Sequence, residues 1–163
     1  MTTYSVSRVT TSERSGPRAT LWLLRLTAAL LTVCVLLQPV LAGGYLSGDF
    51  DQLEWHAINA SVVDSLVMVQ IVVALCFWLI GRGKPWPVPL SVATFLAAGL
   101  QTGMGYSRNL AVHIPLGVGI VLLALAMCGL VFHPSAKVGR PRAARLESLP
   151  ADLGKTRRLG VFR

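Results

Sequence analysis

The chain has little charge for its length, and this shortage excludes an ordinary soluble domain. Only 13% of its 163 residues are Asp, Glu, Lys or Arg, about half of the roughly 25% that is usual in soluble proteins. Hydrophobic residues make up 53%, which is more than a small soluble fold can hide from water. The composition therefore predicts an integral membrane protein whose surroundings are the lipid bilayer.

Cysteine is also scarce. Cys34, Cys76 and Cys128 all lie in apolar segments, and no two of them form a Cys-x-x-Cys pair. This spacing excludes a disulfide framework and a cysteine-bound zinc site. We expect the three thiols to be small core residues.

Basic residues are in excess, with a net charge of +8, but their positions do not suit nucleic acid. Most of them lie in the first 25 residues or after Phe132, where they flank apolar segments, and no motif of a nucleic-acid-binding fold occurs. We therefore expect no nucleic-acid partner and interpret the charge as a signal of membrane topology.

Four apolar segments are long enough to cross a bilayer as helices, which takes about 20 residues each. Short stretches rich in Gly, Pro or polar residues separate them, so consecutive helices should be antiparallel neighbours. The sequence predicts an all-α, up-down four-helix bundle within residues 20–133. Its predicted spans are about 21–42, 55–80, 88–105 and 110–132.

The distribution of charge predicts the orientation. Both tails and the loop 81–87 are basic, whereas the other side carries Asp49, Asp51 and Glu54, with Arg108 as its only Lys or Arg. Both termini are therefore expected in the cytoplasm, with the bundle in the plasma membrane.

The tails 1–19 and 134–163 are Arg-rich with little apolar periodicity, so disorder is predicted for both.

For the first span, a signal peptide cleaved after Ala42 is the alternative to a membrane-spanning helix, although the apolar run is long for a signal peptide.

One pattern of rare residues occurs twice, from Gln38 to His56 and from Gln101 to His113. In the predicted topology both glutamines lie near the outer ends of outward-running helices. Both histidines lie near the outer ends of inward-running helices. The sequence therefore predicts a helical hairpin used twice.

Each histidine is followed four residues later by a very small residue, Ala60 or Gly117. These small residues lie on the same helical face as the histidines. They leave room for a flat group, or they let two helices approach closely. With 3.6 residues per turn, one buried stripe is predicted below each histidine. Below His56 it contains Asn59, Ala60, Val63, Val67, Gln70 and Ala74. Below His113 it contains Leu116, Gly117, Ile120, Ala124, Met127 and Val131.

Two interpretations of the histidines stay open. In the first, His56 and His113 are the axial ligands of one haem, because facing helices in a bundle core can supply imidazoles to haem iron. Arg108 at the same level would pair with a haem carboxylate, and Tyr45 and Tyr106 would hydrogen-bond there.

In the second interpretation these residues only anchor the bundle at the membrane interface, where His, Tyr and Gln are common. The chain would then be a structural or accessory membrane subunit without a cofactor. His133, near the cytoplasmic end, is expected to be interfacial in either case.

Asp64 is the acidic residue inside a predicted span. Facing lipid at the bilayer centre would cost roughly 2.5–3.5 kcal/mol, so we expect it to face the bundle. It either carries protons or accepts a hydrogen bond from a ligand group, or it is a structural carboxyl that is protonated or paired with Ser61 or Ser65. A small proton-coupled transporter is a third hypothesis, although no unwound mid-membrane helix is predicted.

The segments "LAGGY…EWH" (Leu41 to His56) and "GY…VHIPLG" (Gly105 to Gly117) resemble one four-helix half of the haem A synthase family. They are also similar to small four-helix actinobacterial membrane proteins that keep one such unit. The resemblance covers roughly residues 25–133. It implies haem b held by His56 and His113. A homodimer of this chain would be needed to rebuild the eight-helix form of that family.

The chain also departs from that family. Leu53 stands where the family has a catalytic carboxylate, and the family's outer-loop cysteine pair is absent. Whether the chain is an enzyme is therefore left open. We expect electron transfer or haem handling. Because one haem near one face cannot carry electrons across the membrane, a quinone or a membrane redox protein is expected as partner.

Overall fold

The computed structural model describes residues 18–139, which form four long helices and one short 3-10 helix without any strand. The predicted all-α, four-helix arrangement is confirmed for these residues. The elements are α1 (Arg18–Leu46), α2 (Asp51–Leu79), α3 (Pro87–Tyr106), α4 (Leu110–Phe132) and η1 (Pro134–Lys137).

Helices α1 and α2 continue further toward their shared loop than predicted. The first turn of α2 holds Asp51 and Glu54, whose negative charges are favourable at a helix N-terminus. This favourable interaction with the helix N-terminus explains why α2 begins at Asp51, four residues before the predicted span at 55.

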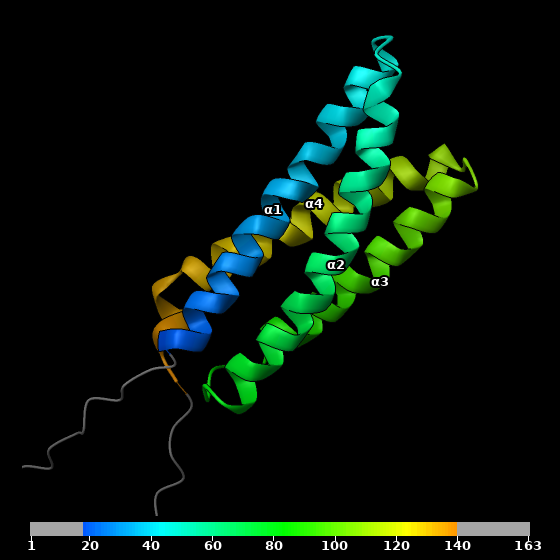
Figure 1. Cartoon of the computed structure of the whole chain (residues 1–163). Helices are drawn as coiled ribbons and strands as arrows, with labels where there is room; N and C mark the ends of the chain where they lie inside the picture. The colour runs from blue at the N-terminus through cyan, green and yellow to red at the C-terminus, as the bar shows by residue number, and fades with distance from the viewer. Residues whose placement is uncertain (1–17, 140–163) are drawn as a thin grey trace, which may run out of the picture.

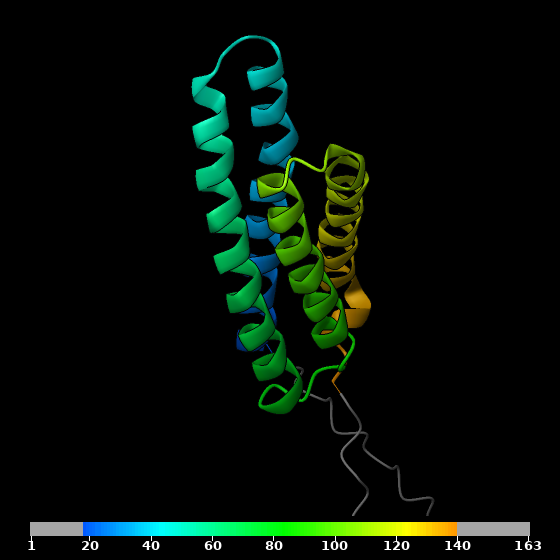
Figure 2. The same ribbon diagram turned by 90° about the vertical axis from the view of Figure 1, so that its right-hand side faces the viewer.

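The four helices form a ring in which α1 and α3 each pack against both α2 and α4 (Figure 1). Helices α2 and α4 therefore lie diagonally across the interior. Residues 18 and 139 lie at one end of the bundle, here called the terminal end. The loops 47–50 and 107–109 lie at the other, called the histidine end. There the α1–α2 hairpin reaches beyond the α3–α4 hairpin (Figure 2).

The buried faces follow the helical periodicity of the sequence. The predicted stripes on α2 and α4 are largely confirmed, with Ala60, Leu116 and Gly117 only half-buried. The buried residues are Asn59, Val63, Val67, Gln70, Ala74 and Phe77 on α2, and Ile120, Ala124, Met127 and Val131 on α4.

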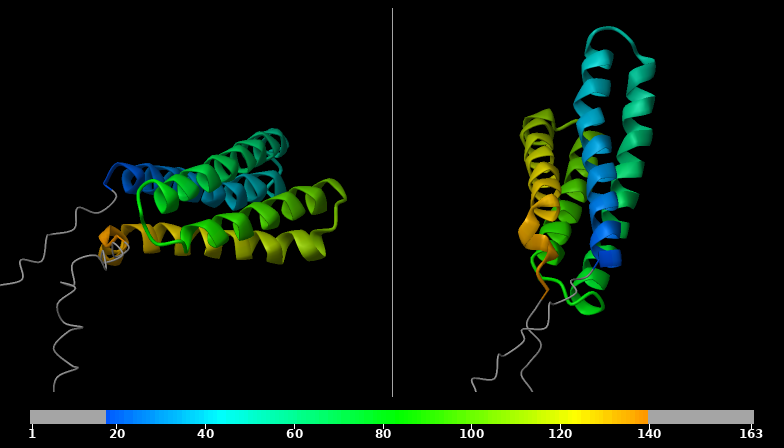
Figure 3. Two further views of the ribbon diagram at one scale, coloured as in Figure 1. Left: turned by 90° about the horizontal axis from the view of Figure 1, so that it is seen from below. Right: turned by 90° about the vertical axis from the view of Figure 1, so that its left-hand side faces the viewer.

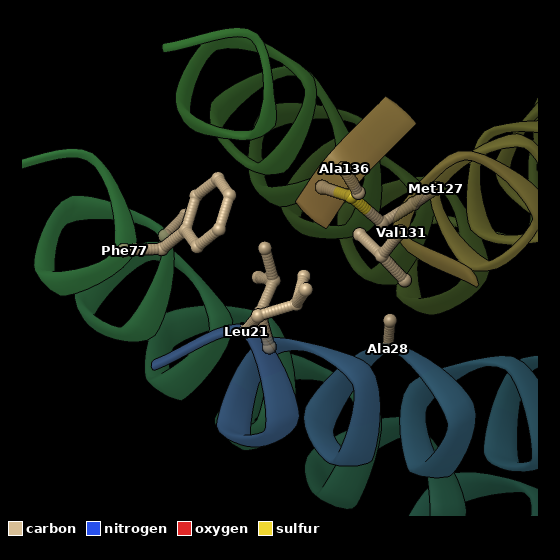
Figure 4. Packing of buried hydrophobic residues seen from close by; sticks show 8 residues of the cluster. Leu21, Ala28, Phe77, Met127, Val131 and Ala136 are labelled. Carbon is tan, nitrogen blue, oxygen red and sulfur yellow. The ribbon is translucent and has the colours of Figure 1, made fainter. Parts of the chain in front are cut away.

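Two hydrophobic clusters fill the interior. At the terminal end, Leu21 and Ala28 of α1 meet Phe77 of α2 and Val131 of α4 (Figure 4). Closer to the histidine end, a second cluster contains Leu31, Val35, Val63, Val67, Ile120 and Ala124. Between this second cluster and the histidine end, the described residues contain no further hydrophobic core cluster.

The outer surface is apolar, as expected for contact with lipid. Large side chains such as Leu26, Val72, Leu96 and Leu122 are exposed, and a soluble monomer rarely shows so much contiguous apolar surface. Among the described residues, α1, α2 and α4 are long and apolar enough to cross a membrane. Helix α3 has 20 residues, including Pro87, Pro89 and Gln101, and is not among these three, so the fourth membrane span stays a prediction.

The first residues after α4 belong to the folded part. Tail disorder was expected from residue 134, but Pro134–Lys137 form η1, and buried Ala136 packs in the cluster at the terminal end. The physical reason is that this alanine covers apolar surface between α1 and α4. The remaining tail predictions, for residues 1–17 and 140–163, lie outside the described residues.

A buried arginine ties α1 to α4 at the terminal end. Arg25 is 6% exposed, and its Nε donates to the backbone oxygen of Val131 at 2.9 Å. Its guanidinium also lies over the rings of Trp22 and Phe132, at 5.1 and 5.2 Å from their centroids. The last carbonyls of a helix lack intrahelical partners and favour a nearby positive charge, so this contact suits both helices.

Replacing Arg25 with methionine should lower the thermal unfolding midpoint of the purified protein in detergent. The change leaves a buried carbonyl without its donor, which costs about 1–3 kcal/mol. Arg108→Met is the matched control, because Arg108 is exposed. Equal midpoints for the two variants would contradict a stabilising role for Arg25.

Candidate functional site

His56 of α2 and His113 of α4 face each other across the interior at the histidine end. Their ring centroids are 6.3 Å apart and their planes are inclined by 53°. Both residues are half-buried. The structure therefore brings together the two histidines that the sequence pairs, although they are 57 positions apart.

The Nδ1 atom of each histidine lies within hydrogen-bond distance of a backbone carbonyl of the preceding helix. Nδ1 of His56 lies 3.2 Å from the Gln38 backbone oxygen, and Nδ1 of His113 lies 3.0 Å from that of Gln101. A carbonyl oxygen only accepts hydrogen bonds, so a bond to it requires the proton on Nδ1 and leaves a lone pair on Nε2. The two glutamines of the repeated pattern thus act through their main chains.

The glutamine side chains lie against the small residues that follow each histidine. One end of the Gln38 amide is 3.0 Å from Nδ1 of His56, and the other is 3.1 Å from the backbone nitrogen of Ala60. The Gln101 amide nitrogen lies 3.0 Å from the place that a Cβ of Gly117 would occupy. Ala60 and Gly117 therefore make room for these amides as well as for the space between the helices.

The contacts of His56 are compatible with two tautomers. Donation from Nδ1 to the Gln38 backbone oxygen leaves Nε2 free, whereas donation from the Gln38 amide to Nδ1 places the proton on Nε2. A metal bound at Nε2 selects the first tautomer, because it needs that lone pair. For His113, the Gln101 backbone oxygen is the partner described for Nδ1.

A cavity of about 450 Å³ adjoins the two imidazoles and is lined by residues of all four helices. This volume lies within the roughly 300–1,000 Å³ typical of small-molecule sites. Its walls are mainly apolar, with few polar groups. The predicted site residues that line it are His56, His113, Gln38, Gln101, Ala60, Gly117 and Asp64.

Asp64 faces this cavity and pairs with a residue that sequence reasoning missed. Thr102 of α3 donates from Oγ1 to Oδ2 of Asp64 at 3.2 Å. Ser61 and Ser65 instead donate to backbone oxygens of their own helix, at 3.3 and 2.8 Å. Of the alternatives for Asp64, the pairing with these serines is therefore wrong, and the others stay open. The position of Thr102, directly after Gln101, was the available signal.

Three predicted residues do not line the cavity. Arg108 is exposed in the α3–α4 turn with φ of 56°, a left-handed conformation that commonly ends a helix. Tyr106 is 84% exposed. Tyr45 packs its ring edge-on against Phe50, with centroids 5.9 Å apart. Their contacts with a carboxylate at the cavity's outer edge stay a prediction.

A proline and an asparagine shape the α1 wall of the site. Pro39 lies inside α1 and has no N–H to donate to the backbone oxygen of Val35. Beside this turn, buried Asn59 donates from Nδ2 to the Cys34 oxygen at 2.8 Å. Asn59 therefore fixes α2 to α1 one turn below His56.

Within residues 18–139, no group of three or more His, Cys, Asp or Glu side chains gathers to hold a metal ion. His133 lies at the terminal end, where its Nδ1 contacts Oγ of Ser135 at 2.9 Å. The candidate site thus has two nitrogen ligands, which is too few for a structural zinc site but enough for haem iron.

Comparison with protein-family models, with curated proteins and with solved structures finds no match for this chain. The functional assignment therefore rests on the geometry of the site.

Gly117→Ala should be less stable than Gly119→Ala by about 1 kcal/mol, because the new methyl group crowds the Gln101 amide. The two glycines lie two residues apart on α4, and a Cβ at Gly119 would have no neighbour within 4 Å. Thermal unfolding midpoints in detergent give the comparison. Identical midpoints would show that Gln101 moves away without loss.

Proposed function

We propose that this chain is an integral plasma-membrane protein that binds one b-type haem between His56 and His113. The observation that carries the proposal is the matched support of the two rings. Each Nδ1 bonds to the backbone oxygen of a glutamine on the preceding helix, so each Nε2 is directed away from that carbonyl. A metal-bound histidine usually has such a second partner, which fixes its tautomer and orientation.

The distance between the rings suits one metal atom. Metal–imidazole bonds are about 2 Å long, so two coaxial rings on opposite sides of a metal have centroids roughly 6 Å apart. The centroids of His56 and His113 are 6.3 Å apart. An inclination of 53° between the planes is compatible, because axial imidazoles can rotate about their metal–nitrogen bonds.

The composition of the site favours haem over a bare metal ion. A porphyrin supplies four ligands of its own, so two histidines complete the iron. The adjoining cavity has mainly apolar walls, which suit a porphyrin face. Bound haem would supply one-electron redox chemistry. The chain's residues would hold both imidazoles in position and exclude water from them.

The proposal extends to the topology. Both ends of the described chain lie at one end of the bundle, as four crossings require, with α3 as the fourth span packed against α2 and α4. The basic loop 81–87 lies at that end and the acidic residues near residue 50 at the other, so the termini are cytoplasmic. The histidines then lie near the extracytoplasmic face, on two copies of one hairpin.

A haem at this depth needs a partner to carry electrons further, either a quinone or a membrane redox protein. The same site also suits haem handling, in which the haem itself is the cargo. A cofactor-free accessory subunit would use the same histidine contacts only to fix two interfacial side chains.

Absorption spectra test the proposal directly. The protein purified from haem-supplied cells should show a Soret band and, after dithionite reduction, a sharp alpha band. We expect His56→Ala and His113→Ala each to lose the low-spin spectrum, because each removes an axial ligand. His133→Ala is the matched control and should keep it. A colourless wild-type protein, still colourless after added haem, would reject the proposal in favour of the accessory subunit.

A second prediction concerns the support of His113. A Cβ on Gly105 would lie 3.1 Å from Cε1 of the His113 ring, whereas a Cβ on Gly103 would meet nothing within 4 Å. Gly105→Ala should therefore displace the ring and weaken haem binding about tenfold, the lower end of the loss usual when the groups that hold a metal-bound histidine in place are altered. Gly103→Ala should bind as wild type in a haem titration. Equal affinities would show that the ring position does not limit binding.

A further inference from the structure

The wall of the cavity is open on one side. All of the lining residues contributed by α2 and α3 are buried or half-buried. The exposed lining residues come only from α1 and α4, and they are Pro39, Gly43, Leu46, Ile114 and Val118. The cavity therefore opens between the histidine-end parts of α1 and α4.

The packing of α1 against α4 explains this opening. Their described hydrogen bonds, from Arg25 to Val131 and from Thr32 to Ala124, lie in the half toward the terminal end. The cluster that contains Val35 and Ile120 is the last one between them. Beyond it the two helices diverge (Figures 1 and 3).

The rim of the opening is apolar. Leu46, Ile114 and Val118 are 82%, 62% and 57% exposed, and the rim carries no charged side chain. Both helices are among those able to cross a membrane, so most of the opening would face acyl chains. The polar groups of the cavity, including His56, His113 and Asp64, lie deeper, toward α2 and α3.

We propose that haem enters and leaves this site sideways from the outer leaflet, through the opening between α1 and α4. The inference rests on the proposed function and selects haem handling as its main role. A flat ligand with a large apolar face partitions into lipid and would pass this rim without meeting a charge. The chain has no Cys-x-x-Cys-His motif for covalent attachment, so the bound haem would stay exchangeable.

Transfer kinetics test the route. Apo-protein in liposomes is mixed with haem-loaded vesicles, and the Soret band of the bis-histidine complex is followed. Val118→Trp narrows the opening and should slow loading about tenfold, equivalent to roughly 1.4 kcal/mol in the barrier. Release to added apomyoglobin should slow to a similar extent, while the final spectrum and reduction potential stay unchanged.

Leu122→Trp is the matched control. Leu122 lies one turn further along α4 and is 62% exposed, but it does not line the cavity. This variant should load and release haem as the wild type does. If Val118→Trp is as fast as Leu122→Trp while the histidine-dependent spectrum is intact, the lateral route is wrong and the haem site stands.

A second measurement needs no haem. Val118→Cys is spin-labelled in a chain whose three native cysteines are replaced by alanine, and its collisions with molecular oxygen and with a water-soluble nickel chelate are compared. We expect oxygen to dominate, because it concentrates in lipid. Dominance of the chelate would overturn the lateral route. A lipid-facing label together with no haem binding in the wild type would instead reject the proposed function, and with it haem as the cargo.

Discussion

The structure depends on one constraint, which is that polar groups in an apolar interior need partners within the protein. Arg25 donates to a backbone oxygen near the end of α4, and Asn59 donates to a backbone oxygen of α1 close to Pro39. The two histidines meet the constraint through the carbonyls of Gln38 and Gln101. These contacts join different helices, so the same bonds that satisfy polar groups also determine how the helices lie.

The constraint also explains why the two ends of the bundle differ. At the terminal end, apolar packing and the bond from Arg25 to Val131 close the interior. At the histidine end, the imidazoles, the Asp64–Thr102 pair and the glutamine amides surround a cavity. Oε1 of Gln101 is buried without a described protein partner. The few polar groups in this mainly apolar wall therefore keep hydrogen-bonding capacity that the packing of the helices does not use.

Much of the fold could be predicted from the sequence, because apolar length and 3.6-residue periodicity are local properties. The buried stripes that contain Val67 and Ala124 follow directly from them. The pairing of His56 with His113 followed from equal depth on helices of equal direction. The use of the Gln38 and Gln101 main chains could not be predicted, because it depends on how closely neighbouring helices approach. The Asp64 partner on α3 and the exposed position of Arg108 depend on the same inter-helix geometry.

The support of the histidines makes their separation independent of a ligand. Each ring is bonded to a helix that precedes its own in the chain, so under the proposed function neither imidazole would have to be ordered on binding of the metal. Such preorganisation reduces the entropic loss of binding. The open side between α1 and α4 does not disturb the support of the histidines. The carbonyl partners of the rings come from α1 and α3, and the exposed rim residues of α4 make none of these bonds. The proposed pair of ligands would therefore stay in place beside the proposed entrance, as reversible loading requires.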